Sequence, residues 1–315
     1  MLLSVLTATV VLQTTPMPRE VTLPSEPAAL SGTLVDAGPD ASAALIIAGS
    51  GPTDRDGNSP LGVSAGTYRL LADDLAAQGI STLRYDKRGV GQSAGAMVAE
   101  ADLRFSHFVD DARAWAGLLR EQTGQSCVWL IGHSEGSLIA QSVAAEDPTG
   151  ICGLVLVSGA GRPAAVVLRE QLSAGTPEPY LSQALTIVDA LDAGETIDCP
   201  PLFAALCRAS VQPYVISWMD VDPAALAAQS VLPTLVVQGS TDIQTTVTDA
   251  QALAGAREGI ELAVLEGVNH VLKRAPIERT ANLATYADPA LPLADGVVPT
   301  ISAFILRPRE AQPQP

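Results

Sequence analysis

Basic residues are scarce in this sequence. Its 315 residues include 18 lysines and arginines against 34 aspartates and glutamates, so the formal net charge is −16. Only two of the basic residues are lysines, Lys87 and Lys273, and the arginines are spread thinly along the chain. A protein that binds phosphate backbones needs a concentrated positive surface. The composition therefore excludes a nucleic-acid-binding protein.

Long hydrophobic runs are also missing. The single candidate, Leu2 to Leu12, is too short to span a bilayer, so no stable membrane span is expected. Its length suits a secretory signal peptide, although it lacks a basic n-region and a clear cleavage site. We expect residues 1–18 to be a signal peptide or a disordered segment. The first case implies a periplasmic or secreted protein, and the second a cytoplasmic one.

Cysteine is limited to four positions, none in a Cys-x-x-Cys arrangement, and the three histidines lie far apart, so no structural metal is implied. The four cysteines fit either two disulfides in an oxidising compartment or ordinary buried thiols. Cys199 and Cys207 are expected to form a disulfide if the protein is exported.

What the chain does contain is the pattern of a packed α/β protein, with 47% apolar and 17% charged residues and no internal repeat. Short apolar runs alternate with segments of helical period from residue 43 onward, which indicates parallel strands with crossover helices. An antiparallel pair at 20–23 and 29–35 precedes them. The predicted strands are 43–48, 81–85, 127–132, 152–157, 234–239 and 261–265. The predicted helices are 65–78, 104–121, 136–145, 247–254 and 297–306.

One interval is much longer than a crossover requires. About 75 residues separate the strand ending near Val157 from the strand starting near Thr234, whereas a crossover usually needs roughly 10–15. Apolar residues recur there at helical spacing. We predict a helical cap at 159–232 over the carboxyl ends of the strands, where ligands bind in open α/β sheets. The core is then 19–158 and 233–307, with a tail at 308–315; a separate domain is the alternative for the inserted residues.

The segment Gly132-His133-Ser134-Glu135-Gly136 lies between a predicted strand and a predicted helix. This is the G-x-S-x-G pattern in the context that a nucleophile elbow requires. The glycines two residues before and after the serine remove side chains that would collide with the neighbouring strand and helix. Ser134 is therefore the predicted nucleophile.

A serine hydroxyl needs a base that takes its proton, and an acid orients that base. In this fold the acid follows one of two late strands. Of the three histidines, His133 lies within the elbow and should point to the other side of the turn, and His107 begins a remote helix. His270 follows the last predicted strand and is the predicted base. Asp242 follows the strand before it and is the predicted acid, with Asp249 and Asp222 as fallbacks. The alternative for Asp242 is an Asx turn or a helix cap.

The oxyanion hole should combine the N–H of Glu135 with one from the early loop that begins Gly49-Ser50-Gly51. We expect Gly51 to supply that second donor, with Ser50 as the alternative. The charged run at 54–56 in the same loop is either a solvated or internally paired turn or in contact with substrate.

Four motifs together resemble the α/β-hydrolase family, particularly bacterial serine esterases and lysophospholipase-like hydrolases. They are GSGPTDRDGN at 49–58, RYDKRGVGQS at 84–93, GHSEG at 132–136, and the pair QGSTD at 238–242 and GVNH at 267–270. The chain departs from many relatives, which place a histidine before the glycine of the oxyanion loop. The resemblance implies that the second motif is structural and that the reaction transfers an acyl group to water without a cofactor. The expected partner is a small-molecule ester of short to medium acyl chain.

Other functions are compatible with parts of the sequence. A thioesterase, an aminopeptidase and a noncatalytic binding protein could all use this fold, and an aminopeptidase would need a carboxylate in the cap to pair with the substrate amine. The candidates for that carboxylate are Glu170, Asp189, Asp192, Glu195 and Asp198. The run 89–94 satisfies G-x-G-x-x-G/A, but the residues between strand and first glycine disfavour a dinucleotide site. The oligomeric state does not follow from the sequence.

Overall fold

A computed structural model describes residues 17–308 of the chain. Most of the predicted N-terminal segment and of the tail therefore lies outside the described residues, although Pro18 already belongs to the first strand. Within residues 17–308, no helix is both long enough and apolar enough to cross a membrane.

An eight-stranded sheet with the order β1-β2-β4-β3-β5-β6-β7-β8 forms the centre of the molecule. β2 is antiparallel to β1 and β4, and the remaining neighbouring pairs are parallel. The strands are β1 (Pro18–Leu23), β2 (Leu30–Val35), β3 (Ser42–Ile47), β4 (Ile80–Tyr85), β5 (Val128–His133), β6 (Ile151–Val157), β7 (Thr234–Gly239) and β8 (Ile260–Leu265). The predicted strands are all confirmed, with ends that differ by at most two residues.

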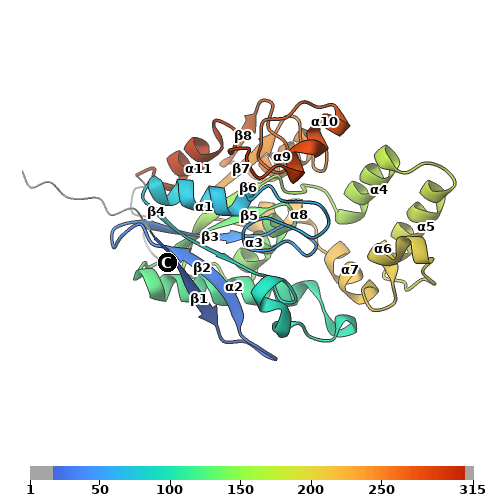
Figure 1. Cartoon of the computed structure of the whole chain (residues 1–315), viewed down its shortest axis with the longest axis horizontal. Helices are drawn as coiled ribbons and strands as arrows, with labels where there is room; N and C mark the ends of the chain where they lie inside the picture. The colour runs from blue at the N-terminus through green and yellow to red at the C-terminus, as the bar shows by residue number, and fades with distance from the viewer. Residues whose placement is uncertain (1–16, 309–315) are drawn as a thin grey trace, which may run out of the picture.

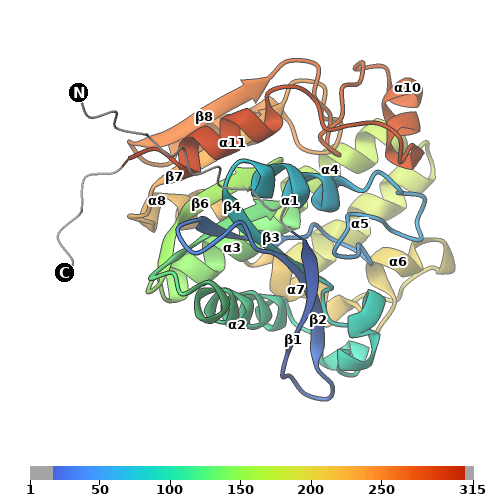
Figure 2. The same ribbon diagram turned by 60° about the vertical axis from the view of Figure 1, so that its left-hand side comes forward.

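Helices cover both faces of the sheet because the side chains of its strands alternate between two apolar cores (Figures 1 and 2). Leu45 and Ile47 of β3 belong to the core under α2 and α3, whereas Ala44 and Ile46 belong to the core under α1 and α11. The helices on the sheet are α1 (Thr67–Ala77), α2 (Phe105–Thr123), α3 (Glu135–Glu146), α9 (Val247–Gly255) and α11 (Val297–Ile305). The predicted helices are thus also confirmed. The short α10 (Arg279–Ala284) was not expected from the sequence.

The long interval between β6 and β7 holds five helices, in agreement with the prediction of a helical insertion. They are α4 (Ala164–Gly175), α5 (Tyr180–Asp192), α6 (Ala204–Cys207), α7 (Gln212–Met219) and α8 (Pro223–Gln229). The first four project from the sheet as a lobe on the right of Figure 1, and they enclose a small apolar core of their own. α8 returns to the main core, where Ala227 is buried.

All four cysteines are paired. Cys127, just before β5, is bonded to Cys152 at the start of β6, and Cys199 is bonded to Cys207 in the insertion. The structure therefore contains the disulfide expected for Cys199 and Cys207. The first disulfide joins two strands at their amino ends, and the second closes a short loop around α6.

Candidate active site

Ser134 occupies a strained turn between β5 and α3. Its φ is 54° and its ψ is −121°, a region that residues other than glycine rarely adopt. A Cβ atom at position 132 would lie 2.2 Å from the carbonyl oxygen of Gly136, and one at position 136 would lie 2.2 Å from that of Ile47. The reason inferred for both glycines is confirmed, because a larger residue at either position would collide with backbone.

His270 and Asp242 form a buried pair next to this turn. The His270 Nδ1 atom is 2.8 Å from the Asp242 Oδ2 atom, and both residues are about 5% exposed. His270 lies in the loop after β8 and Asp242 in the loop after β7. The second ring nitrogen of His270, Nε2, has no hydrogen-bond partner within residues 17–308.

Asp242 is held as a carboxylate by its surroundings. Its Oδ1 atom accepts hydrogen bonds from the backbone N–H groups of Gln244, at 2.8 Å, and Thr245, at 3.1 Å. Burial acts to raise the pKa of Asp242, but the charge of His270 and these donors outweigh burial and lower the pKa below its usual value. Asp242 thus forms the Asx-type turn considered as its alternative role and also binds His270.

The remaining candidates for base and acid have other partners. The Asp249 carboxylate binds Arg162 at 2.9 Å, and Asp222 caps the N-terminus of α8. His107 lies in the first turn of α2, where its Nδ1 atom accepts from the N–H of Arg104. None of the three lines either of the cavities at Ser134.

His133 is neutral and links two loops of the site. The hydroxyl of Tyr68 accepts from the N–H of Gly49 and so donates to His133 Nδ1, each at 2.9 Å. His133 Nε2 therefore carries the proton, and it donates to the carbonyl of His270 at 2.7 Å. Burial, and then the nearby His270, lower the pKa of His133 to about 3. His133 therefore supports the backbone of His270, and it lines the larger cavity together with Ser134.

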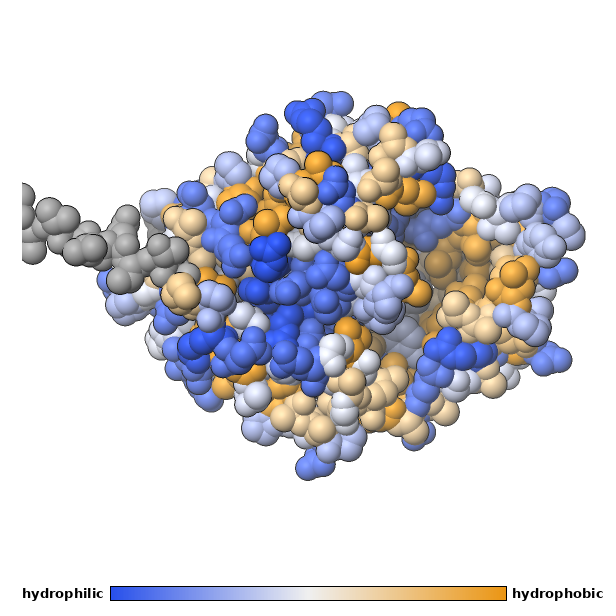
Figure 3. Space-filling model, in the orientation of Figure 1, coloured by the Kyte–Doolittle hydropathy of each residue, from blue (hydrophilic) through white to orange (hydrophobic). Residues whose placement is uncertain are grey.

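Two cavities adjoin Ser134. One, of about 120 Å³, lies between the elbow and the insertion and has a largely apolar wall that includes Val167, Leu168 and Trp218. The other, of about 230 Å³, contains His270 and the loop from Gly49 to Thr53. Figure 3 shows the surface hollowed between the insertion and the rest of the molecule, with apolar residues around the hollow. Ser134 therefore lies between the two cavities, so a ligand bound at Ser134 could place one part in each of them.

Parts of the chain are similar to known enzymes. Residues 61–192 match the family model described as serine aminopeptidase, S33. Esterase EstD of Thermotoga maritima is 25% identical over 75% of this chain, and human monoglyceride lipase is 28% identical over 68%. The aligned segments span 57% of EstD and 73% of the human lipase, so the chain covers little more than half of EstD.

A solved structure shows the same fold. Est1E from Butyrivibrio proteoclasticus, solved with ferulic acid bound, superposes with a TM-score of 0.59 at 17% identity, covering 90% of this chain and 96% of the other. The chain has the α/β-hydrolase fold. The family model includes the elbow of this chain but ends before Asp242 and His270, so those two residues rest on the geometry alone.

Sequence reasoning missed a buried ion pair beneath the elbow. The Nζ atom of Lys87, in the loop after β4, is 3.3 Å from Oε2 of Glu135, and both side chains are 2% exposed. Lys87 also donates to the carbonyl of Gly49 and lies 5.1 Å from the centre of the Phe108 ring. Glu135 accepts a hydrogen bond from Tyr214 of α7. The available signal was a lysine, one of only two in the chain, two residues after the end of a buried strand.

Charged residues of the first two motifs bind one another or other buried side chains. Asp86 accepts from the backbone N–H of Arg55 at 2.8 Å and from its Nε atom at 3.1 Å, and Asp56 accepts from Arg84 at 2.9 Å. Arg55 and Asp56 are therefore paired with residues of β1 and of β4 and its following loop, and not with each other. Arg88 binds Asp111 through two hydrogen bonds, of 2.8 and 2.6 Å, in agreement with a structural role for the second motif.

Three backbone N–H groups near Ser134, those of Glu135, Ser50 and Gly51, have no acceptor within residues 17–308. That of Glu135 begins α3 and has no partner in the helix. In the early loop, Gly51 has a φ of 73° and lines the larger cavity, whereas Ser50 lines both cavities together with Ser134. Within residues 17–308 the N–H of Ser50 makes no hydrogen bond.

Proposed function

We propose that the protein is a serine hydrolase that cleaves carboxylic esters of short to medium acyl chain through Ser134, His270 and Asp242. The observation that carries this proposal is the buried His270–Asp242 pair, which leaves Nε2 of His270 free in the cavity that Ser134 also lines. A serine on a strained turn, a base with one free nitrogen and an acid on the other nitrogen are the parts of an acyl-transfer site.

In the first half of the reaction, Oγ of Ser134 attacks the ester carbonyl and Nε2 of His270 takes the hydroxyl proton. Asp242 holds the ring in the required tautomer and stabilises the imidazolium. The carbonyl oxygen becomes an anion that the N–H of Glu135 and an N–H of the Gly49–Gly51 loop stabilise. When the C–O bond breaks, His270 gives its proton to the leaving alcohol, and the acyl group stays on Ser134.

In the second half, water replaces the alcohol. His270 takes a proton from this water as its oxygen attacks the acyl-enzyme, and the same N–H groups stabilise the second anion. The bond to Ser134 then breaks and His270 returns the proton to Oγ. The products are the carboxylic acid and the free enzyme, so no cofactor enters the balance.

The charges around the cavities favour an ester over the N-terminus of a peptide. Glu170 binds Arg162, and Asp189 and Asp192 bind Arg169, while Glu195 and Asp198 are exposed. Of the described residues that line the two cavities, Glu135 is the only carboxylate, and Lys87 neutralises it. A substrate ammonium would therefore find no free carboxylate, which an aminopeptidase needs.

The cavity between elbow and insertion is small and has a largely apolar wall. Its volume of about 120 Å³ supports an acyl chain of short to medium length. In this proposal the insertion acts as the cap of the site, because α4 and the residues around α8 supply most of that wall. The larger cavity at His270 is then left for the alcohol side of the ester.

The test is hydrolysis of p-nitrophenyl acetate, butyrate and octanoate by the wild type and by Ser134→Ala. Ser137→Ala is the matched control, because Ser137 lies one turn along the same helix and its hydroxyl has no partner among the described residues. We expect the wild type and Ser137→Ala to hydrolyse acetate and butyrate esters faster than octanoate, and Ser134→Ala to be inactive.

A fluorophosphonate probe separates the alternatives. If no ester is cleaved but the probe labels the wild type and not Ser134→Ala, the nucleophile is active and the substrate is an amide or a thioester. If neither hydrolysis nor labelling occurs, the proposal of a serine hydrolase is wrong and a binding protein on this fold becomes the better explanation.

A further inference from the structure

Two buried side chains hold the backbone of Gly49, one at its N–H and one at its carbonyl. The N–H of Gly49 donates to the hydroxyl of Tyr68 at 2.9 Å, and its carbonyl accepts from Nζ of Lys87 at 2.5 Å. Gly49 is therefore fixed at both of its polar groups. The next N–H, that of Ser50, has no acceptor within residues 17–308.

The geometry of the peptide group connects Lys87 to that N–H. A trans peptide is planar, so the carbonyl of Gly49 and the N–H of Ser50 point in opposite directions. Lys87 is buried and lines neither cavity, whereas Ser50 lines both of them beside Ser134. Because Lys87 draws the carbonyl away from the cavities, the N–H of Ser50 is turned towards them.

The charge of Lys87 is balanced by Glu135, whose backbone N–H also lacks an acceptor. Lys87, which holds the carbonyl of Gly49, forms an ion pair with Glu135, the first residue of α3. A buried ion pair rarely adds much to stability, because desolvation costs about as much as the attraction returns. Its position between two unpaired backbone donors suggests a different role.

We propose that Lys87 is a positioning residue that orients the N–H of Ser50 as the second donor of the oxyanion hole, with Glu135 as its counter-ion. This inference rests on the proposed function and replaces Gly51, the donor expected from the sequence, by Ser50. Without the Lys87 ammonium, the Gly49–Ser50 peptide is free to rotate, and the N–H of Ser50 no longer points at the oxygen anion of the intermediate. Removal of one such donor typically reduces turnover by about 10²–10³.

The experiment compares Lys87→Met with Arg88→Met. Both remove a buried cation from the same loop, but Arg88 contacts Asp111 and the carbonyl of Ala96, away from the cavities. Rates are measured with p-nitrophenyl butyrate per active site, as titrated with the fluorophosphonate. We expect Lys87→Met to lower kcat about 10²-fold with KM within about threefold, and Arg88→Met to keep the wild-type kcat per titrated site.

A second readout distinguishes orientation of the donor from a general loosening of the fold. A trifluoromethyl ketone forms a tetrahedral adduct whose oxygen anion uses the same donors, so its affinity should fall by the same factor as kcat/KM in Lys87→Met. An unchanged kcat per site, a loss confined to KM, or an equal loss in Arg88→Met would overturn the inference.

Two further measurements cover a variant that does not fold and a wild type that does not cleave esters. The double variant Lys87→Met/Glu135→Gln leaves no buried charge unpaired, so it should fold and show the same loss in kcat. If the wild type reacts with the fluorophosphonate but cleaves no ester, the ester proposal alone fails, and slower labelling of Lys87→Met still supports the role of Lys87. Equal labelling rates would overturn that role, as would a wild type that is not labelled.

Discussion

At the scale of single residues, the site depends on which nitrogen of each histidine carries a proton. Asp242 binds Nδ1 of His270, which leaves Nε2 to face the cavity. Tyr68 donates to Nδ1 of His133, which places that proton on Nε2. The two rings lie 4.8 Å apart between centroids and therefore have opposite duties, one exchanging protons in the proposed reaction and the other remaining neutral.

Replacement of Asp242 by asparagine tests the orientation of His270. An asparagine keeps the size of the side chain but can donate to Nδ1, so it stabilises the tautomer with the proton on Nε2. We expect kcat to fall by about 10⁴ with little change in melting temperature. Asp249→Asn is the control and should keep turnover. Wild-type turnover in Asp242→Asn would show that another group is the acid.

Buried His133 makes stability depend on pH. Its pKa of about 3 in the folded protein lies below the value of about 6.5 in an unfolded chain. Between these pH values the unfolded chain binds a proton that the folded chain does not. The contribution of neutral His133 to the free energy of unfolding is therefore complete above pH 6.5 and decreases as the pH falls. From pH 7.5 to 5 the loss is about 2 kcal/mol. Urea unfolding at both pH values should show a smaller difference in His133→Gln, and an equal difference would contradict the assignment.

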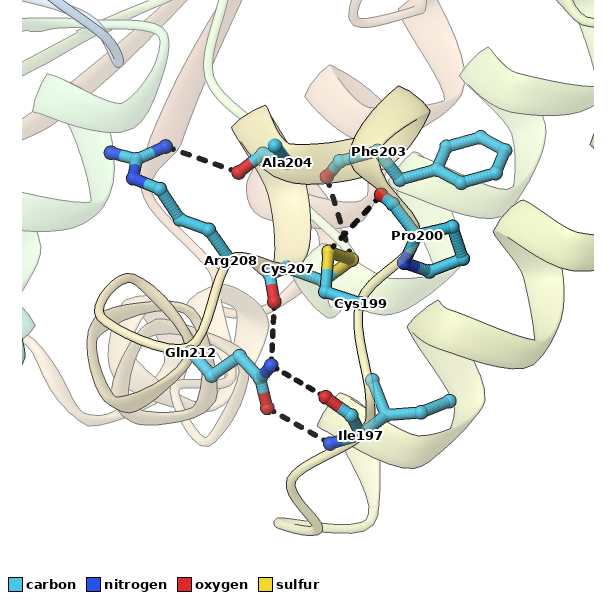
Figure 4. Close-up of a disulfide and its surroundings, with 8 residues drawn as sticks. All are labelled: Ile197, Cys199, Pro200, Phe203, Ala204, Cys207, Arg208 and Gln212. Carbon is cyan, nitrogen blue, oxygen red and sulfur yellow. Dashed lines mark hydrogen bonds between the residues drawn. A yellow bond between two sulfur atoms is a disulfide. The ribbon is translucent and has the colours of Figure 1, made fainter.

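At the scale of elements, α7 connects the insertion to the core built on the sheet. Tyr214 of α7 binds Glu135, Ser217 accepts from the backbone N–H of Phe105 at 2.9 Å, and Trp218 lines the cavity at the elbow. Figure 4 shows how the start of α7 is fixed in turn. The amide of Gln212 binds both backbone groups of Ile197 and the carbonyl of Cys207, which clamps the disulfide loop onto this helix.

Loss of the Cys199–Cys207 disulfide should therefore change substrate binding. We expect the double Cys199→Ser/Cys207→Ser variant to lose about 2–3 kcal/mol of stability, as for a short closed loop, and to show a KM several-fold higher at nearly constant kcat. The matched control is Cys127→Ser/Cys152→Ser, at the opposite end of the sheet from the cavities, which should lose stability without a change in KM. Four free thiols in the unreduced, unfolded wild type would contradict both expectations.

The elements themselves could be predicted from the sequence because most are long enough to show a period. The strands from β3 to β8 are short apolar runs between helical segments, and the elbow glycines mark the turn at Ser134. The six-residue α10 is too short to produce such a pattern. The Lys87–Glu135–Tyr214 contacts were also not predictable, because their partners are 48 and 79 positions apart in the chain and meet only when the sheet and the insertion are assembled.

At the scale of the whole molecule, the net charge of −16 acts on any charged substrate. A negative protein repels an anionic ester over a distance that dissolved salt shortens, from about 30 Å at 10 mM to about 8 Å at 150 mM. We expect kcat/KM for an anionic p-nitrophenyl hemisuccinate to rise several-fold between these salt concentrations, and kcat/KM for neutral p-nitrophenyl butyrate to stay nearly constant. Equal responses of the two esters would show that local charges at the site outweigh the net charge.

The burial of both lysines has a practical consequence. Lys87 is 2% exposed and Lys273 is fully buried, and the chain has no other lysine. An acylating reagent for amines or a protease that cuts after lysine thus finds no lysine side chain on the folded surface. Each can react with one only when the fold opens locally, so the reaction rate at position 87 reports opening beneath the elbow, and the rate at 273 reports opening of the loop that carries His270.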